Sequence, residues 1–263
     1  MYPYELFWGI DLYTLMITLG VVVCLLLIRL QGDMRGLKAK FQNDVLTLVP
    51  MAVLLGYGAS VVVQAFYNMI KEGHFEINVS TGSTFYGGLL GGAIAVIAVY
   101  FGLGHFRYRD GYHLSHFRDV VDLAPACITV AHGLGRIGCL MAGCCHGAPT
   151  DAWYGIYMVS EGCRVVPVQL FEALFLLTLC GALLLLMKKG YRHQMPIYMM
   201  SYSAWRFFVE YLRADDRGQT VVSFLSPSQL FSVLMMLGGI AVLIAELWAD
   251  RRKREKGTGE EHA

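Results

Sequence analysis

The sequence has few charged residues for its length. Only 16% of its 263 residues are Asp, Glu, Lys or Arg, whereas a soluble domain carries about a quarter. The net charge of +1 gives no global electrostatic reason to expect nucleic acid or an acidic substrate as a partner. Internal repeats and long linkers are also missing. The N-terminal segment MYPYELFWGID lacks a basic region and a small-residue cleavage site, so no cleavable signal peptide is expected.

Long apolar runs make up most of the chain instead. The sequence is 56% hydrophobic and has a mean hydropathy of +0.50. Several runs reach about 20 residues, enough for a helix to cross roughly 30 Å of hydrocarbon. The sequence therefore predicts an all-α, polytopic membrane protein. The seven expected spans cover residues 10–29, 46–70, 84–104, 120–143, 168–187, 195–213 and 227–248.

The basic residues between the spans predict the orientation. Fifteen of them fall in the odd-numbered loops and the tail, and four in the even-numbered loops. The fifteen are Arg29, Arg35, Lys38, Lys40, Arg107, Arg109, Arg118, Lys188, Lys189, Arg192, Arg251, Arg252, Lys253, Arg254 and Lys256, and the four are Lys71, Arg164, Arg213 and Arg217. The positive-inside rule then places the N-terminus outside and the C-terminus in the cytoplasm. We expect one transmembrane domain over residues 1–250 and a basic, disordered cytoplasmic tail over 251–263.

Ionisable residues within spans indicate function, because they are costly in a bilayer and usually face a cavity or a partner. The sixth span contains Tyr202, Arg206 and Glu210 at intervals of four, which places them on one helical face. Arg206 and Glu210 could simply neutralise each other between helices. Gln169 and Glu172 open the fifth span.

Arg136 lies within the fourth span, among the glycines of HGLGRIG. The positions four before and four after it are His132 and Leu140, so no acidic residue lies one turn away. A guanidinium without a local counter-ion suits a phosphate, which it can bind through two parallel hydrogen bonds. The structural alternative is an interhelical ion pair with Glu172 or Glu210.

The third span begins with STFYGGLLGG. Small residues in this pattern are typical of close helix packing in membranes. Gly87 and Gly88, after Tyr86, would also permit a broken helix beside a cavity.

A cysteine cluster follows Arg136 at the outer end of the fourth span. Cys139, Cys144, Cys145 and His146 could converge on a metal, although adjacent cysteines differ from the usual spacing of structural zinc sites. Cys144 or Cys145 could instead form a disulfide with Cys163 in an oxidising exterior. The third alternative is that they are small packing residues.

Four segments, in order, resemble the bacterial prolipoprotein diacylglyceryl transferases. YGGLLGG is similar to that family's HGGLIG, GRIGCLMAGCCHG to its GRIGNFINGELYG, and VPVQLFEA to its HPSQLYEA. YSAWRFFVEYLRADD is similar to its Tyr-x-x-x-Arg-x-x-x-Glu-x-x-Arg segment. The family's topology of seven spans with the N-terminus outside also matches.

The resemblance implies transfer of the diacylglyceryl group of phosphatidylglycerol to the thiol of a lipobox cysteine in a prolipoprotein signal peptide. A thioether forms and glycerol phosphate leaves, without a cofactor, in the bacterial plasma (inner) membrane. Arg136 and Arg206 would bind the phosphate. The residues implied to line or brace the same site are Tyr202, Glu210 and Arg213, with Gln169, Glu172, Gly87 and Gly88 from the other matching segments.

The chain departs from the family's pattern at the residues closest to the chemistry. Tyr86 stands where the family has a His proposed as the base for the thiol. Cys139, Ala142, Cys144 and His146 stand where the signature has Asn, Asn, Glu and Tyr. We expect His146 to supply the missing base. The alternatives are a divergent paralogue that uses the same lipid site with another acceptor, and a non-catalytic lipid- or metal-binding protein that senses redox state.

Overall fold

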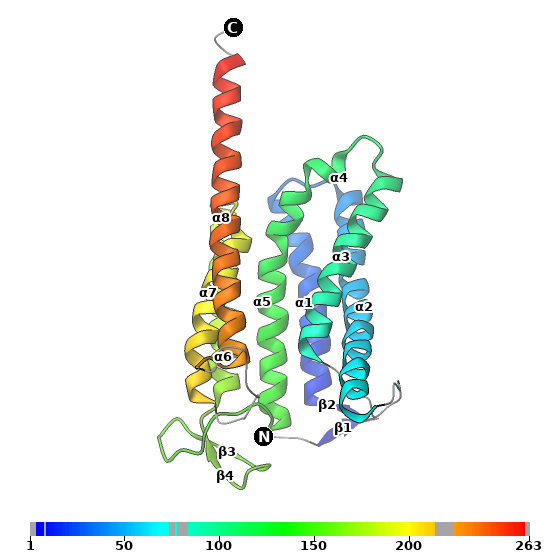
Figure 1. The fold of residues 1–263 in the computed structure, drawn as a ribbon. Helices are drawn as coiled ribbons and strands as arrows, with labels where there is room; N and C mark the ends of the chain where they lie inside the picture. Colours follow the sequence, from blue (N-terminus) through cyan, green and yellow to red (C-terminus); the bar gives the residue numbers. More distant parts are fainter. Residues whose placement is uncertain (1–3, 8, 74–76, 78–83, 214–223, 261–263) are drawn as a thin grey trace. The chain divides into compact units, whose positions relative to one another are not determined.

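The computed structural model describes residues 4–7, 9–73, 77, 84–213 and 224–260, most of them in helices (Figure 1). The elements, in chain order, are β1 (Glu5–Phe7), β2 (Ile10–Asp11), α1 (Leu12–Met34), α2 (Ala39–Glu72), α3 (Phe85–Arg107), α4 (Tyr112–Ser115), α5 (Phe117–Ala142), β3 (Ile156–Met158), β4 (Cys163–Val165), α6 (Val168–Lys188), α7 (Gln194–Val209), the 3₁₀ turn η1 (Glu210–Leu212) and α8 (Pro227–Glu260). The chain forms two compact units, Leu25–Val120 and the remainder.

Six helices in the described part of the chain are long and apolar enough to cross a membrane: α1, α2, α3, α5, α6 and α8. Their apolar side chains are largely exposed, since only 11% of the most apolar stretch of α3 and of α8 is buried. Such surfaces require lipid as their solvent. The chain is therefore an all-α, polytopic membrane protein, as the sequence predicts.

The remaining predicted span, 195–213, is shorter in the structure. It becomes α7, with 16 residues, followed by the three-residue turn η1. A helix of this length falls short of the roughly 20 residues that cross a bilayer. The count of seven spans and the orientation stay predictions.

The unit that contains α5 to α8 also holds two short antiparallel strands beyond the end of α5. β3 and β4 pair Ile156 with Val165 and Met158 with Cys163. Met158 and Val165 are fully buried and pack against Leu140 near the end of α5. This small core fixes the loop that follows α5, where the cysteine cluster lies.

Helices α7 and α8 lie side by side in the same unit (Figure 1). A Cβ at Gly239 would come within 3.0 Å of Met199 and Met200, so the glycine allows the two helices to approach closely. This contact brings the beginning of α8 to the end of α7, which carries Arg206.

The other unit is built mainly from α2 and α3. The glycines that open α3 pack against α2: a Cβ at Gly88 would lie 3.3 Å from Cβ of Ser60, and one at Gly56 would lie 3.0 Å from the Gly88 carbonyl oxygen. α3 is continuous from Phe85, so the broken helix that two glycines would permit does not form. Close packing explains this stretch.

The basic tail differs from its expectation of disorder, because α8 continues to Glu260. Arg251 lies 3.9 Å from Glu255, and the Arg252 guanidinium lies 3.7 Å from the centre of the Trp248 ring. Both pairs are four residues apart and stabilise a helix. Residues 261–263 of the predicted tail lie outside the described residues.

Candidate functional site

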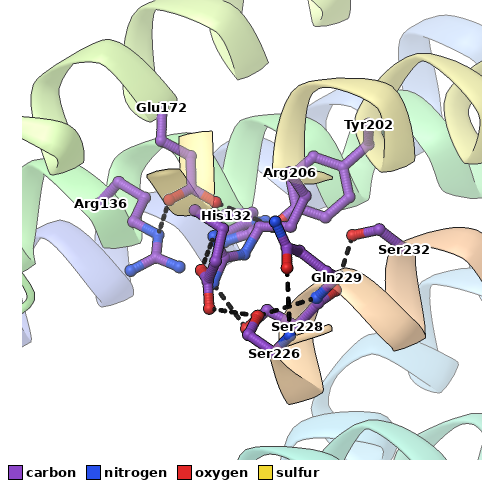
Figure 2. Close-up of polar contacts among 10 residues, drawn as sticks. His132, Arg136, Glu172, Tyr202, Arg206, Ser226, Ser228, Gln229 and Ser232 are labelled. Atoms are coloured by element: carbon purple, nitrogen blue, oxygen red, sulfur yellow. Dashed lines mark hydrogen bonds and ion pairs between the residues drawn. The ribbon is translucent and has the colours of Figure 1, made fainter. Parts of the chain in front are cut away.

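A buried carboxylate joins α5 to α6. Glu172 is completely buried near the beginning of α6, and its Oε2 lies 2.9 Å from Nε of Arg136 on α5. The interhelical pair considered from the sequence therefore forms (Figure 2). Burying the two charges together avoids the penalty of burying either one alone.

Two further side chains surround the same carboxylate. The Tyr202 hydroxyl on α7 donates a 2.9 Å hydrogen bond to Glu172 Oε1. Nε2 of His132, one turn before Arg136, lies 3.8 Å from the same oxygen, and its ring meets Tyr202 edge to face. Glu172 thus links α5, α6 and α7.

The second arginine has a carboxylate of its own. Arg206 Nη1 lies 2.7 Å from Glu210 Oε2 on the same helical face, and Nη2 donates a 2.9 Å hydrogen bond to the Ser228 hydroxyl on α8. The Ser226 hydroxyl donates to the other oxygen of Glu210 at 2.9 Å. The local neutralisation of Arg206 by Glu210 is therefore present, and α8 completes it.

The beginning of α8 presents these serines because of its N-terminal cap. The Ser226 hydroxyl accepts from the Gln229 amide at 3.2 Å, and the Gln229 side chain accepts from the Ser226 amide at 3.1 Å. This reciprocal pair is a capping box, with Pro227 at the first helical position. The segment SPSQ is its signature in the sequence.

The two arginines differ in how many of their guanidinium nitrogens have a partner. Arg206 is 7% exposed, and both its terminal nitrogens are engaged. Arg136 meets Glu172 through Nε, and its two terminal nitrogens have no hydrogen-bond or ion-pair partner in the described part of the chain (Figure 2). Its side chain is 15% exposed. Two such nitrogens match two oxygens of a phosphate.

The loop after α5 is fixed to the beginning of α6 and to the end of η1. The buried Gln169 side chain donates a 2.5 Å hydrogen bond to the Cys144 carbonyl. Gly147 forms a β-bridge with Arg213, and its amide donates to the Val166 carbonyl at 2.9 Å. A Cβ at Gly147 would collide with the Leu212 carbonyl, so this position requires glycine.

His146 lies in this loop, next to Cys145. Its Nε2 is 3.1 Å from Glu161, and its Nδ1 is 3.0 Å from the Gly147 carbonyl oxygen. Both ring nitrogens therefore lie close to oxygen atoms, one of a carboxylate and one of a backbone carbonyl.

All seven cysteines are free thiols, so the alternative of a disulfide from Cys144 or Cys145 to Cys163 is not formed in this structure. Cys163 packs against the small core of β3 and β4 instead. The sulfurs of Cys139, Cys144 and Cys145 all lie within 4.8 Å of one another. Hydrogen bonds from the other two thiols, followed by the charges of Arg136 and Arg213, lower the pKa of the Cys145 thiol.

The structure thus places most predicted site residues in one unit. Arg136, Glu172 and Tyr202 form one set of polar contacts, and Arg206 and Glu210 form a second set in the same unit. Gln169, Arg213 and His146 lie in or against the loop after α5. Gly87 and Gly88 belong to the other unit, as does the backbone of Tyr86, whose side chain lies outside the described part.

Four residues that take part in these contacts are not predicted from the sequence: His132, Ser226, Ser228 and Gln229. His132 appears there only as the residue four before Arg136. A search for capping boxes would have found the other positions, because a cap fixes the direction of the first side chains of a helix.

Known proteins resemble the chain over nearly its whole length. Residues 4–245 match the family described as prolipoprotein diacylglyceryl transferase. Phosphatidylglycerol–prolipoprotein diacylglyceryl transferase 2 of Clostridium perfringens is 30% identical, and the match covers 96% of each chain. The Clostridium tetani transferase is 28% identical over 91% of this chain and 94% of its own. The Clostridioides difficile transferase is 25% identical over 94% of each. With a family match that spans both compact units, this chain belongs to the prolipoprotein diacylglyceryl transferase family.

Proposed function

We propose that this chain transfers the diacylglyceryl group of phosphatidylglycerol to the thiol of a lipobox cysteine in a prolipoprotein signal peptide. The acceptor sulfur forms a bond to the glyceryl carbon as the bond from that carbon to the phosphate oxygen breaks. Glycerol phosphate leaves with the bonding electrons, and the thiol proton passes to a base. Two observations support this proposal. The chain belongs to the transferase family, and the two terminal nitrogens of Arg136 have no partner among the described residues.

Arg136 is the proposed phosphate ligand. Its Nε contact with Glu172 holds the guanidinium in place, while the terminal nitrogens remain for two phosphate oxygens. Negative charge grows on the phosphate as glycerol phosphate departs. A fixed guanidinium stabilises that charge more in the transition state than in the bound lipid, which is the requirement for catalysis.

Arg206 is proposed to supply the second positive charge. Its Nη1 contact with Glu210 is an ion pair that falls outside hydrogen-bond geometry for the described residues. The Arg136 contact with Glu172 has the same character. Because both terminal nitrogens of Arg206 are engaged, its proposed contribution is its positive charge. Tyr202, Glu210, Arg213, Gln169 and Glu172 are proposed to line or brace this site.

His146 is the proposed base for the acceptor thiol. Glu161 at its Nε2 would stabilise the imidazolium that forms when the proton is taken. The acceptor thiol would replace the Gly147 carbonyl at Nδ1. A catalytic role for Tyr86, and roles for Gly87 and Gly88 in substrate binding, remain part of the proposal through the family resemblance alone.

The reaction places the protein in the bacterial plasma membrane, with the site toward the outer leaflet, where secreted prolipoproteins arrive. Its proposed partners are phosphatidylglycerol and the signal peptide, and the proposal requires no cofactor. The tail after residue 250 would then lie in the cytoplasm, where its basic residues favour anionic lipid.

Complementation of a bacterium depleted of its own diacylglyceryl transferase tests the proposal. The wild-type chain is expected to restore growth and prolipoprotein lipidation, and Arg136→Ala and Arg206→Ala are expected to abolish both. Immunoblotting of membranes controls for insertion. Failure of a well-inserted wild-type chain would reject prolipoprotein as the acceptor. Release of glycerol phosphate from phosphatidylglycerol by the same protein would then support a paralogue with another acceptor.

A further inference from the structure

Three thiols beside the arginine contacts have no role in the proposed transfer. Cys139 belongs to the last turn of α5, and Cys144 and Cys145 follow within three residues of its end. Their sulfurs lie within 4.8 Å of one another. The family resemblance puts amide and acidic side chains at the positions of Cys139 and Cys144, so the cluster is a feature of this chain.

The backbone of the loop brings the thiols together. Cys145 has a φ of 61°, the only positive φ at a non-glycine residue in the described ranges. This left-handed conformation is unfavourable for a residue with a Cβ and persists only where the surroundings impose it. The Cys144 amide donates to the Cys139 carbonyl at 3.1 Å, and the Cys144 carbonyl is held by Gln169. Strain of this kind is a reason to look for a ligand at the residue that bears it.

The geometry suits one small, thiophilic ion. Metal–thiolate bonds of about 2.3 Å, the length found in zinc sites, place three sulfurs about 4 Å apart around a trigonal ion. The thiols of this cluster therefore need to move inward by less than an ångström. Among the described residues no fourth ligand joins the three thiols, because His146 is turned to Glu161 and the Gly147 carbonyl.

The number of ligands selects the metal. Soft thiolate ligands select Cu(I), zinc or iron–sulfur clusters, and structural zinc is almost always four-coordinate, so a set of three thiolates favours Cu(I). We propose that Cys139, Cys144 and Cys145 form a three-thiolate binding site for Cu(I).

The charges around the cluster agree with this ion. Binding of Cu(I) to three thiols releases three protons and leaves a complex of charge 2−. Arg136, which also pairs with Glu172, and Arg213 both act electrostatically on Cys145, and positive charge near the cluster favours an anionic complex.

Cu(I) binding would also affect lipid transfer, and only this consequence rests on the proposed function. The copper–thiolate complex and the lipid phosphate would compete for the charge of Arg136. Cu(I) loading is therefore expected to weaken the binding of phosphatidylglycerol. The metal site itself does not depend on that activity.

Titration of the reduced, detergent-solubilised full-length chain with Cu(I) tests the site, with bathocuproine disulfonate as the competing chelator. We expect one Cu(I) per chain and an X-ray absorption spectrum with three sulfur neighbours. Cys139→Ser, Cys144→Ser and Cys145→Ser should each weaken binding more than about tenfold. Cys163→Ser is the matched control, since its thiol lies in the neighbouring β4 and outside the cluster, and it should bind like the wild type.

Several results would overturn the proposal. One is wild-type affinity for Cu(I) in the three cluster variants. Another is a loss of affinity in Cys163→Ser as large as in those variants. A third is tighter binding of Zn(II) than of Cu(I) in a parallel titration. A disulfide within the cluster that yields no Cu(I) binding after reduction would do the same. None of these readings uses lipid transfer, so a failure in the complementation assay leaves this test unaffected.

Discussion

Arg136 and Glu172 form an ion pair between two helices, with Nε and Oε2 2.9 Å apart and the carboxylate completely buried. The pair occupies one nitrogen of the guanidinium and leaves the other two without a partner among the described residues. Glu172 therefore holds the arginine in position without consuming its capacity to bind a phosphate. Glu172 provides structural support and Arg136 binds the ligand. Substitutions of the two residues can therefore measure these effects independently.

Glu172→Gln is expected to destabilise the protein. The amide keeps the shape of the side chain but leaves Arg136 as a buried charge without its carboxylate. Removing one partner of a buried ion pair costs about 3 kcal/mol or more. Unfolding in mixed micelles measures the change in free energy. Glu161→Gln is the control, because Glu161 is 43% exposed and pairs only with His146, and it should stay within about 1 kcal/mol of the wild type. Equal stability of the two variants would contradict the supporting role of Glu172.

Arg136→Lys is expected to reduce transfer while it leaves the protein folded. Lysine keeps the positive charge but offers a single ammonium in place of the planar pair of terminal nitrogens. Loss of one preorganised donor set costs about 100-fold in rate. An assay with labelled phosphatidylglycerol and a lipobox peptide measures kcat/KM. Arg251→Lys, on the exposed end of α8, should retain wild-type kcat/KM. Wild-type activity of Arg136→Lys would show that charge alone suffices.

The two arginines could be predicted from the sequence, because a cation within an apolar span has a high cost and few explanations. The sequence identifies the partner of Arg206 directly, whereas for Arg136 it leaves Glu172 and Glu210 as alternatives. Arg206 and Glu210 are four residues apart, and the sequence gives that pair directly. Arg136 and Glu172 are joined by the packing of α5 on α6, which depends on side chains along both helices and on the loop between them.

Three features depend on contacts or backbone conformations that the sequence alone does not determine. The double glycine of α3 was compatible with packing and with a break, and the choice depends on α2, which lies against it. The tail was expected to be disordered from its charge, but α8 extends into it through pairs four residues apart. The sequence suggests that four side chains converge, whereas in the structure three thiols do so and His146 is turned to Glu161, with a left-handed backbone at Cys145.

Ser228→Ala is expected to weaken the second arginine. The substitution removes the hydroxyl that accepts from Arg206 Nη2, and an unsatisfied buried charged donor costs about 1–3 kcal/mol. The transfer rate should fall together with the free energy of unfolding, because Arg206 loses its hydrogen bond to α8. Ser232→Ala is a close control, since Ser232 is equally buried one turn later but donates only to the Ser228 carbonyl in its own helix. It should cost less than about 1 kcal/mol. The same loss in both variants would mean that Ser228 contributes only to helix packing.

Gly147→Ala is expected to displace the loop after α5. Its Cβ would meet the Leu212 carbonyl and come within 2.8 Å of the Val168 side chain, so the backbone must move. Overpacking of this kind costs about 1–3 kcal/mol. Limited proteolysis of the loop and thermal unfolding in detergent measure the effect. Gly181→Ala, in α6 with open space around the new Cβ, should leave both unchanged. Unchanged protease resistance of Gly147→Ala would show that the loop tolerates a side chain there.

His146→Gln tests the proposed base. Glutamine retains a hydrogen-bonding group near Glu161 and the Gly147 carbonyl but cannot take the proton of the acceptor thiol at neutral pH. Loss of a general base lowers kcat by about 10²–10⁴-fold. The loss should be rescued in part by raising the pH toward the pKa of a free thiol, about 8.5, because the acceptor then ionises without help. Glu161→Gln should show a smaller loss, since it removes only the charge that stabilises the imidazolium. A His146→Gln enzyme with wild-type kcat at every pH would eliminate His146 and direct the search to His132, whose Nε2 lies 3.8 Å from the Glu172 carboxylate.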